Sequence, residues 1–168
     1  DDFVQAVVQV AQQLRVGHPL SVDTDIGAIS SARQLERVKT MLARAEQQGA
    51  QRLCGGASLE PVPGGFYMQP TVVAGVTADM DIAQNEVFGP VLAVMPFDDE
   101  AQAVKLANGT DFGLAAGVWT SQLSRAHRMV RAIRAGVVHV NTYGGPDITV
   151  PLGGVKQSGN GHDKSLHA

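Results

Sequence analysis

The sequence contains little cysteine, few aromatic residues and no long apolar run. A single cysteine among 168 residues excludes an internal disulfide, and we expect a reducing, cytoplasmic location. No apolar run approaches the ~20 residues that a membrane-spanning helix requires. The start, DDFVQAVV, lacks the basic residues that open a secretion signal. The sequence therefore predicts no membrane association.

Charge of one sign is not in excess. The chain has 13 basic and 16 acidic residues, for a formal net charge of -3. This balance gives no electrostatic reason to bind nucleic acid or an anionic membrane. The 5 histidines form no pair at the spacing of metal ligands on a helix, so no metal site is predicted.

The overall composition is that of a globular protein. With 44% hydrophobic and 17% charged residues, the chain is long enough to bury a sizeable core. We expect one domain or a piece of one. The first residues already read as the interior of a helix and lack an initiator methionine, which suggests a piece of a longer protein.

Two amphipathic helices are predicted in the first fifty residues. Apolar residues recur at helical spacing from Phe3 to Leu14, before a stop at Gly17. The segment 31–34, SARQ, resembles a capping box that opens a second helix, and Gly49 ends it. Each helix should bury one face.

Strands and helices alternate along the rest of the chain. Short links between them imply parallel crossovers, and hence an α/β fold, a three-layer sandwich with a mostly parallel sheet. Strands are predicted at 52–54, 91–97, 114–120 and 137–140, and one or two strands at 66–76. Further helices are predicted at about 122–134 and up to residue 108, the latter capped by Asp98 or Asp99.

A long segment rich in Gly and Pro follows the last predicted strand, at about 141–163. Its composition excludes long regular structure, while Ile148, Val150 and Leu152 indicate that it packs against something. It matches neither a phosphate-loop pattern nor the glycine spacing of a dinucleotide-binding turn. It therefore reads as a shaped, functional loop.

The stretch NEVFGPVL, residues 85–92, places a carboxylate and an aromatic ring two residues apart. If Val87 faces inward, the alternating backbone directs Glu86 and Phe88 outward, and the Gly-Pro pair that follows fixes the turn. Such a pair suits a ligand that is polar on one side and flat on the other. The alternative is that Glu86 forms a cap or an ion pair and that Phe88 is core.

Several short motifs, in this order and at this spacing, resemble the aldehyde dehydrogenase superfamily. The resemblance covers essentially the whole chain but corresponds only to the carboxyl-terminal third of such an enzyme, so the chain would be part of its catalytic domain. The tail is further similar to the γ-glutamyl-γ-aminobutyraldehyde dehydrogenase-like branch. The motifs are Pro70–Thr71, Asn85–Pro90, Ala107–Asn108, Phe112–Leu114, Ala135–Val138, Val140–Asn141, Pro151–Gly154 and Ser158–Gly159.

The resemblance implies an NAD- or NADP-dependent oxidation of an aldehyde through a cysteine thioester. Glu86 would bind the nicotinamide ribose hydroxyls and Phe88 would lie against the nicotinamide ring. The nucleophile and general base would lie upstream of Asp1, and the isolated chain would be inactive and bind cofactor weakly at most. Cys54 is not the predicted nucleophile, because it lies in a short apolar strand with nothing nearby in sequence to lower its pKa.

The resemblance also implies a substrate pocket lined by Asn141, Tyr143 and Leu152. Leu152 stands where the family often has an aromatic residue, which favours an aliphatic or amino-aliphatic aldehyde. Asp147 could contact an ammonium group of the substrate. His162 replaces an arginine that is frequent in the family, which puts the ion pair of that arginine in doubt. The complete enzyme would be a homo-oligomer. The alternative is a non-catalytic α/β interaction or oligomerisation module.

Overall fold

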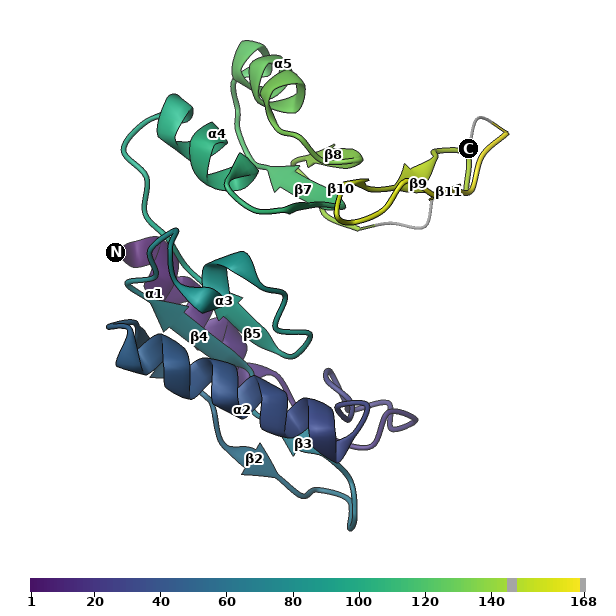
Figure 1. Ribbon diagram of the computed structural model, residues 1–168. Coiled ribbons are helices and arrows are strands. Elements are labelled where there is room, and N and C mark those ends of the chain that lie inside the picture. Colours follow the sequence, from purple (N-terminus) through teal and green to yellow (C-terminus); the bar gives the residue numbers. More distant parts are fainter. Residues whose placement is uncertain (145–147, 167–168) are drawn as a thin grey trace. The chain divides into compact units, whose positions relative to one another are not determined.

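A three-stranded sheet lies at the centre of residues 1–96, the first of two compact units in the chain (Figure 1). The structure, a computed structural model, describes residues 1–144 and 148–166. Strand β4 (Thr71–Ala74) is central, antiparallel to β1 (Gln51–Cys54) and parallel to β5 (Val91–Ala93). The predicted strand at 91–97 is therefore shorter than expected.

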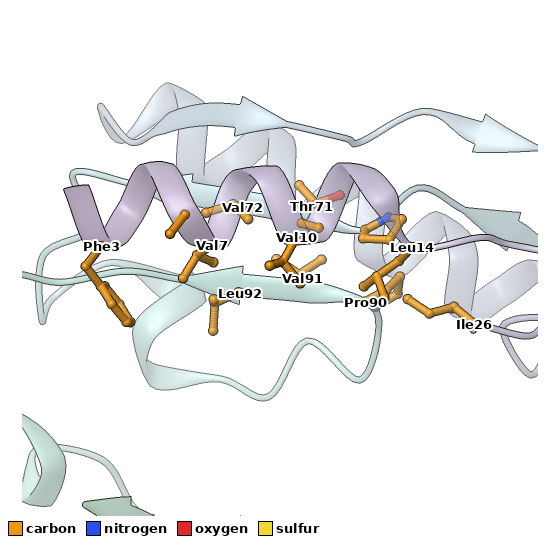
Figure 2. Close-up of a pocket in the computed structure, with 13 residues that line it drawn as sticks. Phe3, Val7, Val10, Leu14, Ile26, Thr71, Val72, Pro90, Val91 and Leu92 are labelled. Carbon is orange, nitrogen blue, oxygen red and sulfur yellow. The ribbon is translucent and has the colours of Figure 1, made fainter. Parts of the chain in front are cut away.

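Two helices cover opposite faces of this sheet and make the unit three layers thick (Figures 1 and 2). Helix α1 (Asp2–Gln13) contacts β1 and β4 from one side. Helix α2 (Ala32–Gln47) packs from the other side, and the short helix α3 (Asp81–Gln84) connects β4 to β5. A small antiparallel hairpin of β2 (Ser58–Leu59) and β3 (Tyr67–Met68) extends from the sheet.

The core of the first unit lies between α2 and the sheet. The predicted apolar face of α2 is buried, because its residues recur at helical spacing toward β1 and β4. The Ser31 hydroxyl accepts a hydrogen bond from the Gln34 backbone N–H at 3.2 Å, which confirms the predicted helix start. The main buried residues are Leu35, Val38, Leu42, Ala45, Met68 and Val73.

The second unit, residues 97–168, is built on a parallel pair of strands. Strand β7 (Ala115–Val118) pairs with β8 (Val137–Val140), and helix α5 (Leu123–Ala132) makes the crossover between them. Helix α4 (Glu100–Asn108) precedes them and begins at Asp99, whose carboxylate accepts from the Gln102 N–H at 2.7 Å. Val118, Met129 and Ile133 form its buried core.

Short two-residue strands complete the second unit. Strand β10 (Val155–Lys156) pairs with β6 (Phe112–Gly113), and β11 (His162–Asp163) pairs with β9 (Leu152–Gly153). Both ladders are antiparallel. The predicted Gly- and Pro-rich loop therefore contains brief pairings that fix parts of its path.

The α/β class is confirmed, with one correction to the pairing. Within residues 1–144 and 148–166, parallel ladders occur only at β4–β5 and β7–β8. In both cases a helix connects the two paired strands along the chain. The other ladders are antiparallel, so the sheets are mixed and small rather than one mostly parallel sheet. No helix in these described residues is long and apolar enough to cross a bilayer.

Candidate functional site

The segment that carries Glu86 and Phe88 lies on the surface of the first unit. Val87 packs against the core, as the alternation predicted, while both neighbours are exposed, Phe88 by 68%. Phe88 has a φ of +55°, an uncommon backbone conformation for a residue with a bulky side chain. The segment lines a hollow of about 350 Å³ with Ile82, Asn85, Gly89, Val91 and Ala93.

Helix α2 holds this segment by its backbone. The Gln34 side chain donates from Nε2 to the carbonyl oxygens of Val87 at 2.9 Å and Phe88 at 3.0 Å. The Arg37 guanidinium donates to the Glu86 carbonyl at 2.9 Å. Three consecutive carbonyls are thus held by two side chains one helical turn apart.

The same contacts correct the capping-box prediction. Ser31 caps α2, but the Gln34 side chain bonds the distant segment instead of turning back to the Ser31 N–H. Sequence reasoning missed Gln34 and Arg37 as parts of the site. The partners of Gln34 lie more than 50 residues later, and no local pattern signals such a contact.

Close packing fixes the end of the segment. A Cβ atom on Gly89 would lie 2.8 Å from Cγ2 of Val38, which is fully buried in α2. A larger residue would therefore push the turn away from the helix. The glycine is required here by space, since its own backbone is not in the left-handed region.

Glu86 is exposed, and the contacts with α2 use its backbone carbonyl. Arg37 bonds its carbonyl, and none of the ion pairs seen within residues 1–144 and 148–166 uses its carboxylate. An exposed carboxylate with free acceptor positions can accept from two hydroxyls of one ligand. The same described residues contain no group of three or more His, Cys, Asp or Glu arranged for a metal ion.

The predicted substrate residues lie in the second unit and have distinct environments. Asn141, at φ +54°, uses both ends of its side-chain amide on Thr120: Oδ1 accepts from the backbone N–H at 2.8 Å and Nδ2 donates to the carbonyl at 3.0 Å. Asn141 thereby joins the carboxyl ends of β7 and β8. Tyr143 is 65% exposed, and its ring lies at a tilt 5.6 Å from that of His139.

Leu152 lies on the separate β9–β11 ladder and is half exposed. It pairs with Asp163, while Gly153 pairs with His162, so the His162 ring covers Gly153. The His162 Nδ1 atom lies 3.2 Å from the Asn160 carbonyl oxygen. Asp147, the predicted ammonium contact, lies outside the described residues.

Cys54 is half-buried at the end of β1, where it pairs with Val72. The chain turns directly after it, at Gly55, whose φ of +75° and close approach to the Pro70 carbonyl leave no room for a side chain. This position is set by the sheet and the turn. Whether Cys54 lacks a catalytic role stays a prediction.

A second hollow in the first unit is an open apolar groove of about 450 Å³ (Figure 2). One wall is the apolar face of α1, and the other is the strand β5 with the loop before it. Figure 2 shows Val7 and Val10 directed toward Val91 and Leu92. Remaining lining residues that the figure labels are Phe3, Leu14, Ile26, Thr71, Val72 and Pro90.

Comparison with known proteins gives a consistent result. The family model described as "Aldehyde dehydrogenase family" matches residues 1–168. A betaine aldehyde dehydrogenase of Mesorhizobium japonicum is 44% identical over 170 residues, which cover 100% of this chain and 35% of that protein. One from Rhizobium etli is 42% identical over 168 residues, covering 99% and 34%. The chain thus spans about a third of the length of these relatives.

Solved structures agree with the sequence matches. The P. syringae indole-3-acetaldehyde dehydrogenase AldA, in complex with NAD+ and IAA, has a TM-score of 0.95 and 46% identity, over 99% of this chain and 34% of that one. The aldehyde dehydrogenase KauB from Pseudomonas aeruginosa gives the same TM-score, identity and coverage. Both identities are high enough to compare residues as well as fold.

Proposed function

Since this chain belongs to the aldehyde dehydrogenase family along its whole length, we propose that it is the carboxyl-terminal part of an enzyme that oxidises an aldehyde to its carboxylic acid. The family membership carries the reaction class. The one structural observation that carries the site is the exposed pair Glu86 and Phe88, held by its backbone on α2. Bound NAD or NADP would supply the hydride acceptor in this reaction.

Glu86 and Phe88 suit the two parts of a nicotinamide nucleoside, the ribose and the nicotinamide ring. The carboxylate has free acceptor positions for a pair of neighbouring hydroxyls, and the exposed Phe88 ring offers a flat apolar surface for an aromatic ring. Because α2 fixes the carbonyls of both residues, each side chain starts from an ordered backbone. Such order matters because the reacting carbon must be held close to its partner.

The nucleophilic cysteine and its general base are proposed to lie upstream of Asp1, in a part of a longer protein that this chain does not include. Cys54 fits the role poorly, since its place at the end of β1 is set by pairing with Val72 and by the turn at Gly55. The apolar groove beside α1 supports the proposal that this chain is one part of a longer protein. Its exposed valines and leucines suit coverage by further protein.

For the substrate, we propose an aliphatic or amino-aliphatic aldehyde. Leu152 supplies an apolar, non-planar wall, and Tyr143 is exposed for contact. Both the oxygen and the nitrogen of the Asn141 amide bond Thr120, so we assign Asn141 a supporting role in the substrate pocket. The betaine aldehyde dehydrogenases among the relatives make a cationic aldehyde a natural first test. The narrower γ-glutamyl-γ-aminobutyraldehyde dehydrogenase-like assignment stays a prediction, as do the homo-oligomer and the cytoplasmic location.

The alternative function is a non-catalytic interaction module, which the same open groove also favours. The two functions differ in what the complete protein does. An enzyme binds NAD and reduces it when an aldehyde is added, whereas a module that has lost the chemistry does neither.

The test compares three proteins in one assay of NAD reduction: the complete protein, the 168-residue chain and the complete protein with Glu86→Gln. We expect turnover by the complete protein and none by the chain. Glu86→Gln keeps the side-chain shape and removes the charge, and should weaken NAD binding about tenfold, the cost of one charged hydrogen-bonding pair. A folded complete protein that binds neither NAD nor NADP and oxidises no aldehyde with either would reject the proposal.

Turnover by the isolated chain that disappears in Cys54→Ala would overturn the assignment of the nucleophile to another segment. Cys54→Ser in the complete protein is the matched control. It should leave the rate of NAD reduction unchanged, because the thiol is proposed to be structural only.

A further inference from the structure

Lys156 has an unusual position for a lysine. It is half-buried at a φ of +56°, in the two-residue strand β10. Its Nζ atom donates to the carbonyl oxygens of Asn108 at 3.0 Å and Thr110 at 2.8 Å. None of the ion pairs formed by residues 1–144 and 148–166 includes it.

The carbonyls that Lys156 binds belong to Asn108, the last residue of α4, and to Thr110 in the turn after it. The last carbonyls of a helix lack partners within the helix and lie at the negative end of its dipole. The ammonium group satisfies one such oxygen, that of Asn108, and also the carbonyl of Thr110 in the turn that follows the helix. This contact, which we call the lysine clamp, therefore ties strand β10 to the carboxyl end of α4.

Neighbouring contacts make the same junction rigid. Asn108 donates from Nδ2 to the Ala132 carbonyl at 2.8 Å and accepts from the Arg134 N–H at 2.7 Å, which joins α4 to the end of α5. The Ser158 hydroxyl accepts from the Gly113 N–H at 3.0 Å. The clamp thus fastens β10 to a part of the unit that is itself well ordered.

Leu152 lies just before this fastened stretch. Between the two, Gly153 and Gly154 are buried, and Gly153 presses its carbonyl so closely on Gly136 that a Cβ there would lie 1.7 Å from the oxygen. The segment is therefore held by close packing on one side and by the clamp on the other. Leu152 itself remains 40% exposed at the edge of this support.

We propose that Lys156 is a positioning residue that sets the place of Leu152 and so determines which aldehydes the site accepts. This inference rests on the proposed function of Leu152 as part of the substrate wall. It concerns substrate binding and not the reacting groups, so its loss should act on KM and on selectivity while kcat changes little.

The main experiment is a double-mutant cycle in the complete protein, with Lys156→Met and Leu152→Ala. Methionine keeps the length of the side chain and removes every donor. We measure KM and kcat for straight-chain aldehydes of increasing length. Lys156→Met should raise KM for the preferred aldehyde about tenfold and flatten the preference among lengths, with kcat within about twofold.

In the Leu152→Ala background the same lysine change should have little further effect on KM, because a residue that acts only through Leu152 has nothing left to position. Additive effects of the two substitutions would overturn the proposal. Lys156→Arg should keep most of the selectivity among aldehydes that Lys156→Met loses, since the arginine guanidinium can donate to both carbonyls. Lys105→Met, on the exposed face of α4, is the matched control and should change nothing.

If Lys156→Met fails to fold, the test of the proposal uses Lys156→Arg alone and combined with Leu152→Ala. If the arginine variant has an altered preference that persists unchanged in the Leu152→Ala background, the proposal is rejected. NAD affinity separates this inference from the proposed function. It should be unchanged in all these variants, and a complete protein that binds neither NAD nor NADP would contradict the proposed function itself.

Discussion

The helices α1 and α2 follow the same sequence pattern but end in different environments. Both are amphipathic, and both lie on the central sheet of the first unit (Figure 1). The apolar face of α2 is buried, with Val38 at 0% and Leu42 at 4% exposure. No residue of α1 is buried, and Val10 remains 60% exposed.

The difference shows what an apolar stripe does and does not determine. Periodicity fixes which face of a helix avoids water, but the partner of that face depends on the rest of the protein. For α2 the partner is the sheet of its own unit. For α1 much of the face opens onto the groove beside β5 (Figure 2), which fits the proposal that a longer protein covers it.

The largest effect expected from this comparison is on stability. Leu42→Ala should lower the free energy of unfolding of the first unit by about 2–5 kcal/mol, the cost of a cavity at a buried leucine. Val10→Ala on α1 should cost under about 0.5 kcal/mol in the same chain, as exposed substitutions do. Hydrogen exchange of the β4 amides reports the opening of this unit. Equal costs for the two variants would break the comparison.

Sequence patterns located the elements that owe their form to local chemistry. The start of α2 follows from the Ser31 side chain, which caps the next turn. For α4 the sequence left Asp98 or Asp99 as the cap, and the structure shows that it is Asp99. The antiparallel pairing of β6 with β10 was beyond such reasoning. Each strand has two residues, too few for periodicity, and they pair across more than 40 positions.

A smaller effect is expected where α2 holds the Glu86 segment. Gln34→Glu replaces the donor to two carbonyls by a carboxylate, and should make local opening of the segment easier by about 1–3 kcal/mol. In the complete protein, NAD affinity should fall about tenfold. Gln47→Glu, on the exposed face of the same helix, is the matched control. Unchanged exchange of the Val87 and Phe88 amides in Gln34→Glu would show that α2 does not order the segment.

In the candidate site, too, some features follow from the local sequence and others depend on residues distant in the chain. Alternation around Val87 predicted that Glu86 and Phe88 lie outside the core, and both are exposed, although the backbone at Phe88 is in the left-handed region and not extended. The contacts that hold them come from Gln34 and Arg37, which look like ordinary surface residues of a helix. Only the fold brings these residues to the segment, so sequence predicted the exposure of the candidate pair but not the contacts that hold it.

The smallest effect concerns the exposed charges that join α4 to α5 beside the core that the two helices share. Glu100 of α4 accepts hydrogen bonds from Arg128 at 2.8 Å and Arg125 at 3.3 Å, both on α5. The hydrogen bond from Arg128, followed by the charge of the same residue, lowers the pKa of Glu100 below its ordinary value despite some desolvation. A lowered pKa means that the ion pair stabilises the fold above the ordinary pKa of a glutamate, and that this contribution disappears as pH falls through the lower, folded value.

Glu100→Gln should therefore weaken the second unit slightly at neutral pH and not at all in strong acid. The difference in unfolding free energy between the parent chain and Glu100→Gln, measured in urea from about pH 7 to about pH 2, should shrink to zero at the acid end. High salt should reduce the difference at neutral pH, because both charges face water. A difference that persists at the acid end would mean that Glu100 acts through packing, and α4 would then resemble α2 more than its exposed ion pairs suggest.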